Sequence, residues 1–526
     1  MGRPIANETF VQALLTYGTY DHYDFFCVDQ HHLRAFQERL EVLVPDSGGR
    51  SRVTGHLHVG LADALRANVY DVFHFGDFTA LLPYMAQARR HFANQPFPIS
   101  GVTHSLDGLL MSTRYQQIVQ AELAPYDAVV CTSECAKESV KRGLSWAHQS
   151  LRGAFPASPV RLERIPLAID VDSFQQVDRA TARALFELPD DVIVALCVGR
   201  LSLRQKADWA PVLERLTRMR AQGGVDRLAV VIAGGGEGEE IALLEQLIQV
   251  TGVGDWVISI PNFDASIKPH LYAAADFYFS LVDNFQETFG LTLLEAMASG
   301  LPVICSEFNG YRELVDHNET GFLVPTTWAE TVPDYLRHIQ GVLLDSPTRL
   351  YHGQMLAVDL DAVDLAFRTL VNDRDLRRDM GERARASAQR YTWPRVIAEY
   401  ETLWAELGEL ARSSPQPTQT DSSIVFDPSE AYAHYAARLL REDTVLGSTD
   451  TGESARQNPA VLVRYEDVQA CLNGKLEQWI LSTVSAGTQT VGSLREGAST
   501  TAAASPGQVD FHILWLLKHG ALRIES

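Results

Sequence analysis

The chain has 526 residues, of which 46% are hydrophobic and 21% charged, a composition typical of folded globular proteins. This length is too great for one hydrophobic core, so we expect about three or four domains. The formal net charge of -21 disfavours nucleic-acid phosphates and anionic lipid surfaces as partners at long range, while leaving room for a local basic pocket.

Cysteine spacing and the length of apolar runs bear on the cellular compartment. None of the six cysteines forms a Cys-x-x-Cys pair, and most lie in apolar, strand-like runs, so we expect reduced core thiols rather than disulfides or zinc ligands. No apolar run approaches the roughly 18 residues that a membrane helix needs. The N-terminal MGRPIAN resembles neither a signal peptide nor a myristoylation signal, because position 6 is Ala. The sequence therefore predicts a cytoplasmic protein with no integral membrane segment.

Short apolar runs alternate with longer amphipathic stretches as far as about residue 325, which is the pattern of β-α-β units. Several runs are almost continuously apolar, as are strands buried on both faces of a parallel sheet. A polar stretch at 175–190 separates two such series, so we predict two Rossmann-like halves with a cleft between them. The strand candidates are 23–29, 69–75, 98–104, 127–133, 192–199, 228–236 and 301–307.

Beyond these two series the pattern becomes helical. Residues 331–390 have a polar, helical pattern, and 391–407 predict one amphipathic helix that accommodates Pro394 in its first turn. A Ser-, Pro- and Thr-rich stretch predicts a linker at 412–423.

Residues 424–526 are expected to form a small accessory module of α+β type. The segment 460–468 (AVLVRYEDV) is strand-like and 475–484 is helix-like. Residues 490–498 and 509–525 have the pattern of the last two helices and the wing strand of a winged-helix-like module. Such a module could be a packing appendage, or could recognise a protein partner or a substrate. The acidic balance and the lack of a basic recognition face disfavour DNA binding.

Two acids flank a predicted helix start in QETFGLTLLEAMASG (286–300). The helix is expected to begin at about Leu291 and to end at Gly300, with Glu287 just before it and Glu295 one turn inside. Free N–H groups at a helix start favour an anion, and a carboxylate there suits hydroxyl donors such as a sugar or a ribose diol. A plainer interpretation is that Glu287 merely caps the helix and Glu295 is a solvated surface acid.

Two upstream stretches place further groups at the same edge of the predicted sheet. VGRLSLRQKAD (198–208) ends a buried strand with Arg200 and carries Lys206 six residues later, and VIAGGGEGEE (231–240) ends another strand in a glycine run. Taken singly, the two cations could be surface charges. Because the carboxyl ends of parallel strands share one edge, and open α/β sheets bind ligands there, we expect these groups to lie together. Asp283, in VDNFQE, is interpreted as loop polarity.

The order GR…K, AGGG, ETFGLTLLEAMASGLPV, NGYREL and TGFLVP over residues 192–325 resembles the donor-binding half of retaining glycosyltransferases of family 4, which have the GT-B architecture. HFGDFT, GVTHSLDG, YDAVVCTSECAKESV and RIPLAIDVDSF resemble landmarks of the N-terminal half, in the same order. The resemblance does not cover the C-terminal module. It implies an acceptor-side Rossmann-like domain at 1–180, a donor-binding Rossmann-like domain at 181–392, a crossing helix at 393–411, the linker at 412–423 and the module at 424–526.

The resemblance also implies roles for individual residues. His104 and Glu287 match catalytic positions beside the transferred sugar, with His74 a less certain second histidine, and Glu295 matches the acid on the nucleotide ribose. The positions that match contacts to the donor diphosphate are Arg200, Lys206, Phe289, Gly290 and Leu291. Nucleobase contacts are expected from the loop at 260–268, whose residues do not choose between bases.

The implied activity is a metal-independent, retaining transfer of a hexose from a nucleotide sugar, such as a UDP- or GDP-sugar, to an acceptor hydroxyl. The acceptor could be a glycan, a small molecule, a lipid-linked sugar or a protein, and no cofactor, metal or nucleic acid is expected. Alternatives are another GT-B enzyme, such as a nucleotide-sugar epimerase or a phosphorylase, or a non-catalytic nucleotide-sugar sensor with the C-terminal module as its output.

The N-terminus departs from the family pattern. Such domains open with a central strand and a glycine-bearing loop near the acceptor, whereas MGRPIANETFVQALL starts in what resembles that loop, with Gly2 in it and a helix from about Asn7. The first strand is therefore expected to be missing, and 460–468 is a candidate to fill its place.

Overall fold

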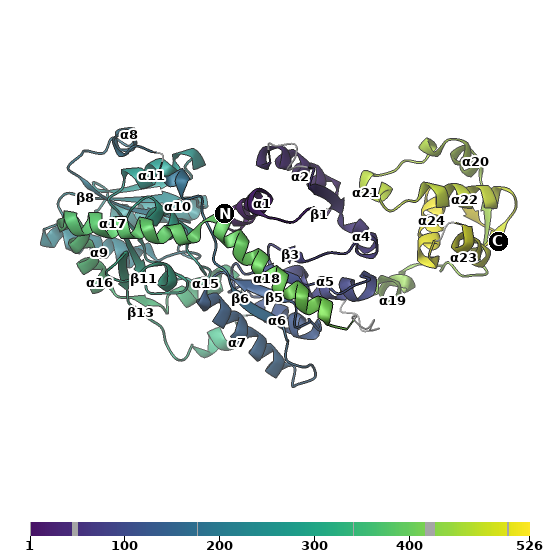
Figure 1. Cartoon of the computed structure of the whole chain (residues 1–526), viewed down its shortest axis with the longest axis horizontal. Helices are drawn as coiled ribbons and strands as arrows, with labels where there is room; N and C mark the ends of the chain where they lie inside the picture. The colour runs from purple at the N-terminus through teal and green to yellow at the C-terminus, as the bar shows by residue number, and fades with distance from the viewer. Residues whose placement is uncertain are drawn as a thin grey trace. The chain divides into compact units, whose positions relative to one another are not determined.

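The computed structural model describes residues 2–44, 51–175, 177–339, 341–343, 345–415, 427–501 and 504–525. They belong to two compact units (Figure 1). Unit 1 comprises Met1–Thr19 and Val69–Thr420, and unit 2 comprises Tyr20–Asn68 and Asp421–Ser526.

The larger sheet of unit 1 has six parallel strands in the order β12-β11-β10-β7-β8-β9. β8 is buried along its whole length, because the sheet is covered on both faces. The predicted strands at 192–199, 228–236 and 301–307 are confirmed. The six strands are β7 (Ile193–Val198), β8 (Leu228–Gly234), β9 (Val257–Pro261), β10 (Phe277–Ser280), β11 (Val303–Ser306) and β12 (Gly321–Val324).

Helices connect these strands and cover the sheet. They are α8 (Arg179–Leu185), α9 (Trp209–Gln222), α10 (Gly238–Val250), α11 (Lys268–Ala274), α12 (Leu291–Ala298), α13 (Tyr311–Leu314), α14 (Asp334–His338), α15 (Asp345–Gly353), α16 (Leu360–Asn372) and α17 (Arg374–Ala388). We call this part of unit 1 the donor half.

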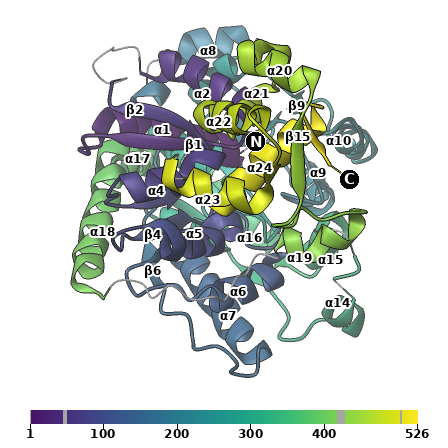
Figure 2. The same ribbon diagram turned by 90° about the vertical axis from the view of Figure 1, so that its right-hand side faces the viewer.

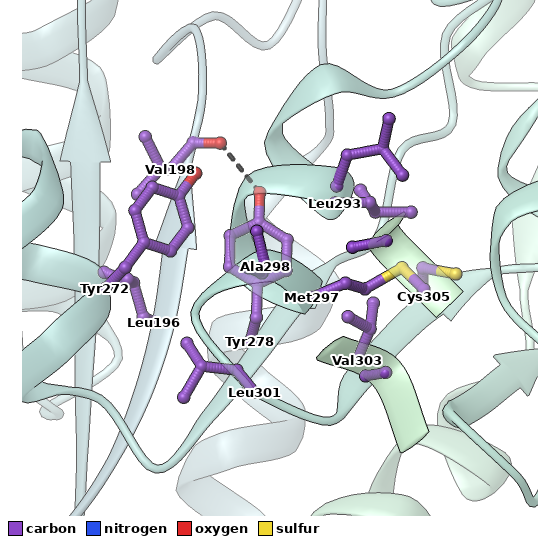
Figure 3. Packing of buried hydrophobic residues seen from close by; sticks show 14 of the residues in the cluster. Leu196, Val198, Tyr272, Tyr278, Leu293, Met297, Ala298, Leu301, Val303 and Cys305 are labelled. Atoms are coloured by element: carbon purple, nitrogen blue, oxygen red, sulfur yellow. Dashed lines mark hydrogen bonds between the residues drawn. The ribbon is translucent and has the colours of Figure 1, made fainter. Parts of the chain in front are cut away.

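The core of the donor half lies between α12 and the sheet (Figure 3). Leu293 and Met297 of α12 are buried against Val303 and Cys305 of β11, and Tyr278 of β10 stands among them. The Tyr278 hydroxyl donates a 2.9 Å hydrogen bond to the Val198 carbonyl oxygen, which satisfies a polar atom deep in an apolar core. This packing holds the start of α12 at the carboxyl edge of the sheet.

The second sheet of unit 1 has four parallel strands in the order β3-β4-β5-β6. The strand predicted at 69–75 is shorter than expected. The elements are α1 (Gly2–Tyr17), β3 (Phe73–Phe75), α5 (Phe78–Phe92), β4 (Ile99–Val102), α6 (Met111–Gln120), β5 (Ala128–Cys131), α7 (Glu134–Ser150) and β6 (Arg161–Arg164). We call this part the acceptor-side half. The two α/β halves confirm the predicted GT-B class, with two Rossmann-like domains.

The predicted amphipathic helix is α18 (Trp393–Ser413), and it begins with Pro394 in the first turn. It packs against α1, and its Trp404 donates from Nε1 to Ser100 Oγ of β4 at 2.9 Å, so it returns the chain from the donor half to the acceptor-side half (Figure 1). Because α18 extends to Ser413, the linker predicted at 412–423 starts inside a helix, and its part from 416 lies outside the described residues.

The described residues of unit 2 form two sheets. β1 (Tyr23–Cys27) pairs in parallel with β2 (Val53–Leu57), next to α2 (Gln30–Leu43) and α4 (Leu61–Ala67). The C-terminal part has an antiparallel sheet in the order β16-β15-β17 with helices packed on it (Figure 2). Its elements are α19 (Pro428–Tyr432), β15 (Val445–Ser448), α20 (Asp450–Gln457), α21 (Glu466–Gln469), α22 (Gly474–Ser485), β16 (Gln489–Thr490), α23 (Val491–Thr501), α24 (Pro506–Lys518) and β17 (Leu522–Ile524).

The C-terminal part has its own core, which includes Leu446, Ile480, Leu494 and Ile513. The predicted order of helix, helix and strand after residue 490 is confirmed by α23, α24 and β17. The strand-like 460–468 is wrong as a strand, because it contains the end of a 3-10 helix at Pro459–Val461 and the start of α21. This segment therefore does not take the place of a missing first strand.

The N-terminus also differs from expectation. Gly2 is the first residue of α1 and does not lie in a loop, and the helix begins five residues before the predicted Asn7. The described strands of the first 170 residues form two separate sheets, β1-β2 and β3-β4-β5-β6, rather than one continuous sheet.

Candidate active site

The loops after β7 and β8 lie against each other at the carboxyl edge of the donor half. Leu201 N–H donates to the Gly235 carbonyl oxygen at 2.8 Å. A Cβ at Gly234 would lie 1.5 Å from the Gly199 carbonyl oxygen, so this close approach of two backbones requires the glycine. The glycine run therefore allows the loop that carries Arg200 and Lys206 to fold over the strand ends.

Lys206 and Glu287 form an ion pair at this edge. Lys206 Nζ donates to Glu287 Oε2 at 2.7 Å and to the Tyr311 hydroxyl at 3.1 Å. Burial opposes the charge on Lys206, but Glu287 and Tyr311 outweigh it and raise the pKa of the ammonium. Burial alone would likewise raise the pKa of Glu287, but Lys206 lowers it below its ordinary value. Both side chains are therefore charged at neutral pH.

Arg200 lies beside this pair and has amide partners. Its guanidinium donates to the side-chain oxygens of Gln205 and, at 3.5 Å, of Gln286. Burial, followed by the charge of Arg349, lowers the pKa of Arg200, while Glu287 acts in the opposite sense. A guanidinium held by neutral amides is ready to accept an anion, because no carboxylate has to be displaced.

The start of α12 is built around Gly290. Its φ of 120° is in the region that favours glycine, and Leu291 is the first helical residue, as predicted. The helix ends at Ala298, followed by Gly300 with φ 78°, which confirms the predicted stop. Phe289 is buried, and its N–H donates to Glu287 Oε1 at 3.3 Å. Glu287 thus also contacts the helix start, as the capping interpretation expected.

Glu295 is a buried acid with two partners, not a surface residue. Its carboxylate accepts from Lys268 Nζ at 2.5 Å and from the Tyr272 hydroxyl at 2.7 Å, and the residue is 7% exposed. The interpretation of Glu295 as a solvated surface acid is therefore wrong. Its role toward a ribose stays a prediction.

His104 comes from the acceptor-side half and lies beside the ETFGL segment. Its Nε2 is 3.0 Å from Asn7 Oδ1 and 2.7 Å from the Gly76 carbonyl oxygen. Its own carbonyl oxygen accepts a 2.9 Å hydrogen bond from Thr288 Oγ1. The structure thus brings His104 to the loop of Glu287 from the opposite half.

His74 has a packing role instead. It lies among the rings of Phe10, Tyr400 and Trp404, and its Nδ1 is 2.9 Å from Ser100 Oγ. Burial, with a smaller effect of His104, lowers the pKa of His74 to about 3. A histidine that stays neutral inside an aromatic cluster is part of the core.

Gly2 does not lie in a loop as predicted, because it is the first residue of α1, and its role toward an acceptor stays a prediction. The residue of α1 that reaches the site is Asn7, through the contact with His104. The loop prediction failed because the sequence places a glycine where the family has a loop, whereas the helix already includes that position.

Several residues of the site were not found from the sequence. Tyr311 lies within the NGYREL motif, which was noted without a role for the tyrosine, and its hydroxyl is 3.0 Å from Ser280 Oγ. Asp283 was interpreted as loop polarity, but it is buried and accepts the Asp208 N–H at 3.0 Å. Burial raises the pKa of Asp283 to about 7. Neither sequence period nor motif order marks such partners, since they depend on which loops meet.

Two features of the described residues bear on the predicted absences. Among them, no group of three or more His, Cys, Asp or Glu side chains could hold a metal ion. No helix in the described part of the chain is long and apolar enough to cross a bilayer. Metal independence itself stays a prediction.

Residues 178–354 match the family described as "Glycosyl transferases group 1". Similar curated proteins include the D-inositol 3-phosphate glycosyltransferases of Geodermatophilus obscurus, at 33% identity over 194 residues, and of Mycobacteroides abscessus, at 32% over 187 residues. These alignments cover 36% and 34% of this chain, and 42% and 40% of the relatives. The chain thus matches well under half the length of these relatives.

Two solved structures are similar in fold. Sucrose-phosphate synthase from Thermosynechococcus elongatus superposes with a TM-score of 0.51 at 23% identity, over 77% of this chain and 93% of that one. Anabaena HepE in complex with UDP and glucose superposes with a TM-score of 0.51 at 16% identity, over 77% and 96%. The fold is that of GT-B glycosyltransferases, and Arg200, Lys206, Glu287 and Glu295 all lie in the segment that matches the glycosyl transferases group 1 family.

Proposed function

We propose that the protein is a cytoplasmic, metal-independent, retaining glycosyltransferase that moves a hexose from a nucleotide sugar to an acceptor hydroxyl. The observation that carries the proposal is the grouping of Arg200, Lys206 and Glu287 with the start of α12, opposite His104. Two cations and a helix start suit a diphosphate, and carboxylates suit sugar hydroxyls.

In the proposed reaction, the bond between the anomeric carbon and the diphosphate oxygen breaks as the acceptor oxygen bonds to the same carbon from the same face. The acceptor proton passes to the departing phosphate. Negative charge therefore grows on the diphosphate, and Arg200 and Lys206 would stabilise it. Lys206 suits this role because Glu287 and Tyr311 hold it in place and keep it charged.

The same arrangement suggests tasks for Glu287 and His104. Glu287 is held ionised by Lys206, so its carboxylate can accept hydrogen bonds from sugar hydroxyls. His104 would face the sugar from the acceptor-side half, with its ring oriented by Asn7 and the Gly76 carbonyl oxygen. Glu295, steadied by Lys268 and Tyr272, would bind the ribose. A dry, aligned cleft between the halves would place the acceptor oxygen.

UDP- and GDP-sugars are the proposed donors, and no cofactor is assigned. Anabaena HepE, which shares the fold, is described with UDP and glucose, so UDP-glucose is the first donor to test. The acceptor would be a glycan, a small molecule, a lipid-linked sugar or a protein. Inositol phosphates join the acceptor screen, because the named relatives are D-inositol 3-phosphate glycosyltransferases.

The first prediction concerns donor binding. Thermal unfolding and slow donor hydrolysis are measured with UDP-, GDP-, ADP- and dTDP-sugars. We expect one donor class to stabilise the protein, by about 2.7 kcal/mol at 100 times Kd, and to be hydrolysed slowly. Arg200→Ala should lose both effects, because it removes a diphosphate partner that needs no displacement.

Arg227→Ala is the matched control, since Arg227 precedes β8 at the opposite edge of the same sheet. It should behave as wild type. Stabilisation without hydrolysis or transfer, in wild type and variants alike, would favour a sensor. Equal donor binding by wild type and Arg200→Ala would overturn the assignment of the diphosphate site.

A further inference from the structure

In the donor half, a helical segment connects two short paired strands. β13 (Thr326–Thr327) pairs with β14 (Ala357–Val358) in an antiparallel ladder, with Thr326 opposite Val358. The segment between them contains α14 and α15, so it leaves and rejoins the donor half at one place. Because the strands at the two ends of this segment pair with each other, α15 belongs to the donor half.

Several contacts fix α15 to the loop that precedes Glu287. Asn284 Nδ2 donates to the Arg349 carbonyl oxygen at 3.4 Å. The ring of Phe285 packs against that of His352 on α15, with centroids 5.9 Å apart, and against that of Trp328, which follows β13, at 4.8 Å. A helix that is held next to the site by ring contacts and a hydrogen bond can set the position of the segments that it contacts.

α15 also binds the loop that carries His104. Arg349 Nε donates to Asp107 Oδ2 at 2.6 Å, and its terminal nitrogen Nη2 donates to Oδ1 at 3.2 Å. The two side chains are only 15% and 9% exposed. Asp345 Oδ1 accepts the Leu109 N–H at 2.7 Å. A bidentate, mostly buried pair of this kind has a defined geometry, because both hydrogen bonds must align at once.

The His104 loop is therefore held at two points by the donor half. Thr288 binds the His104 carbonyl oxygen directly beside Glu287. α15 binds the same loop three to five residues later, through Asp107 and Leu109. Two attachment points on the donor half restrict the orientation of this loop relative to Glu287 more than one would.

We propose that Arg349 and Asp107, with Asp345 and Leu109, form a clasp that sets the position of His104 relative to Glu287 during transfer. Arg349 and Asp107 are positioning residues, since they act through the His104 loop. This inference rests on the proposed glycosyl transfer and gives a role to Asp107 of GVTHSLDG and to Arg349, which lies outside the quoted motifs.

The test uses the full chain with Arg349→Gln, Asp107→Asn and the exchanged pair Arg349→Asp with Asp107→Arg. Hydrolysis of UDP-glucose, or of whichever nucleotide sugar wild type cleaves, supplies kcat, and calorimetry with the matching nucleoside diphosphate supplies Kd. We expect kcat to fall about ten- to a hundred-fold in the single variants, because a small misplacement of a reacting group is costly. Kd should stay within about twofold in Asp107→Asn, and the exchanged pair should recover part of kcat.

Hydrogen exchange of the peptide that contains Leu109 gives a readout that needs no substrate. It should speed up in Arg349→Gln and Asp107→Asn, and stay unchanged in Arg215→Gln, which breaks the Arg215–Asp361 pair on α9 and α16. If a single variant fails to fold, Arg349→Lys keeps the charge without the bidentate geometry and should give the same split in weaker form.

Unchanged exchange at Leu109, or an unchanged kcat, would overturn the clasp. A parallel loss of kcat and diphosphate affinity in Asp107→Asn, which leaves the charge of Arg349 near Arg200 in place, would also overturn it, because a positioning role outside the donor site leaves Kd alone. Failure of wild type to bind or cleave any donor would instead refute the proposed function, and the inference would fall with it.

Discussion

Glu287 and Glu295 belong to the same motif, yet each pairs with a different lysine. Glu287 pairs with Lys206 from the loop after β7, and Glu295 pairs with Lys268 at the start of α11. Tyr311 and Tyr272 add a hydroxyl to each pair. At the residue scale, the site thus contains two lysine–carboxylate pairs. The partners of each carboxylate fix the direction in which its oxygens point toward a ligand.

Asp283 carries a pH prediction at this scale. Burial raises its pKa to about 7, whereas an unfolded Asp titrates near about 3.9. Between these values the folded protein binds more protons than the unfolded chain, so a rise in pH lowers the free energy of unfolding, by at most about 1.4 kcal/mol per pH unit. Asp283→Asn should remove this decline, so its free energy of unfolding should rise relative to that of wild type between pH 5 and 8.

Urea unfolding of both proteins across that range measures the difference. Asp361→Asn is the control, because its carboxylate is 88% exposed and should leave the pH profile unchanged. Parallel profiles for wild type and Asp283→Asn would contradict the assigned burial of the charge.

At the scale of elements, the start of α12 depends on one backbone conformation. Gly290 has a φ of 120°, and a Cβ there would lie 2.6 Å from the ring of Tyr311. Tyr311 is also the partner of Lys206 and Ser280, so the helix start, the ring and the cation share one packing arrangement. A change in the backbone at Gly290 should therefore disturb the Lys206–Glu287 ion pair.

Gly290→Ala should lower the free energy of unfolding by about 2–4 kcal/mol, from backbone strain and the clash together. Chemical denaturation measures it, and loss of donor stabilisation should accompany it. Gly238→Ala is the matched control at the start of α10, where a Cβ meets nothing within 4 Å, and it should be neutral or slightly stabilising. A loss below about 1 kcal/mol at Gly290 would contradict the assigned strain.

At the scale of the whole molecule, the chain has separate cores in its two units. The donor-half cores are built within unit 1, and the C-terminal core of unit 2 is formed by residues between Leu446 and Leu522. Units with their own cores can unfold as separate cooperative transitions.

Calorimetry should therefore resolve two transitions. The nucleoside diphosphate that binds wild type should raise only the transition of unit 1, because the site residues belong to that unit. Arg200→Ala should abolish the shift and leave the second transition unchanged. One transition that moves as a whole with the ligand would contradict this division.

Much of the fold follows from local patterns. The buried runs at 192–199, 228–236 and 301–307 became β7, β8 and β11, and the helix limits at Leu291 and Gly300 follow from glycine and period alone. The grouping of Arg200, Lys206 and Glu287 was also predictable, since the carboxyl ends of parallel strands meet at one edge.

What local patterns could not supply are the long-range partners. Lys206 lies 81 residues from Glu287 and Arg349 lies 242 residues from Asp107, so their pairing depends on the strand order and on the meeting of the two halves. For the same reason 460–468 failed as a strand, and Gly2 was misplaced. Periodicity and turn chemistry act over a few residues and therefore specify elements, whereas burial and charge pairing act through space and therefore await the assembled fold.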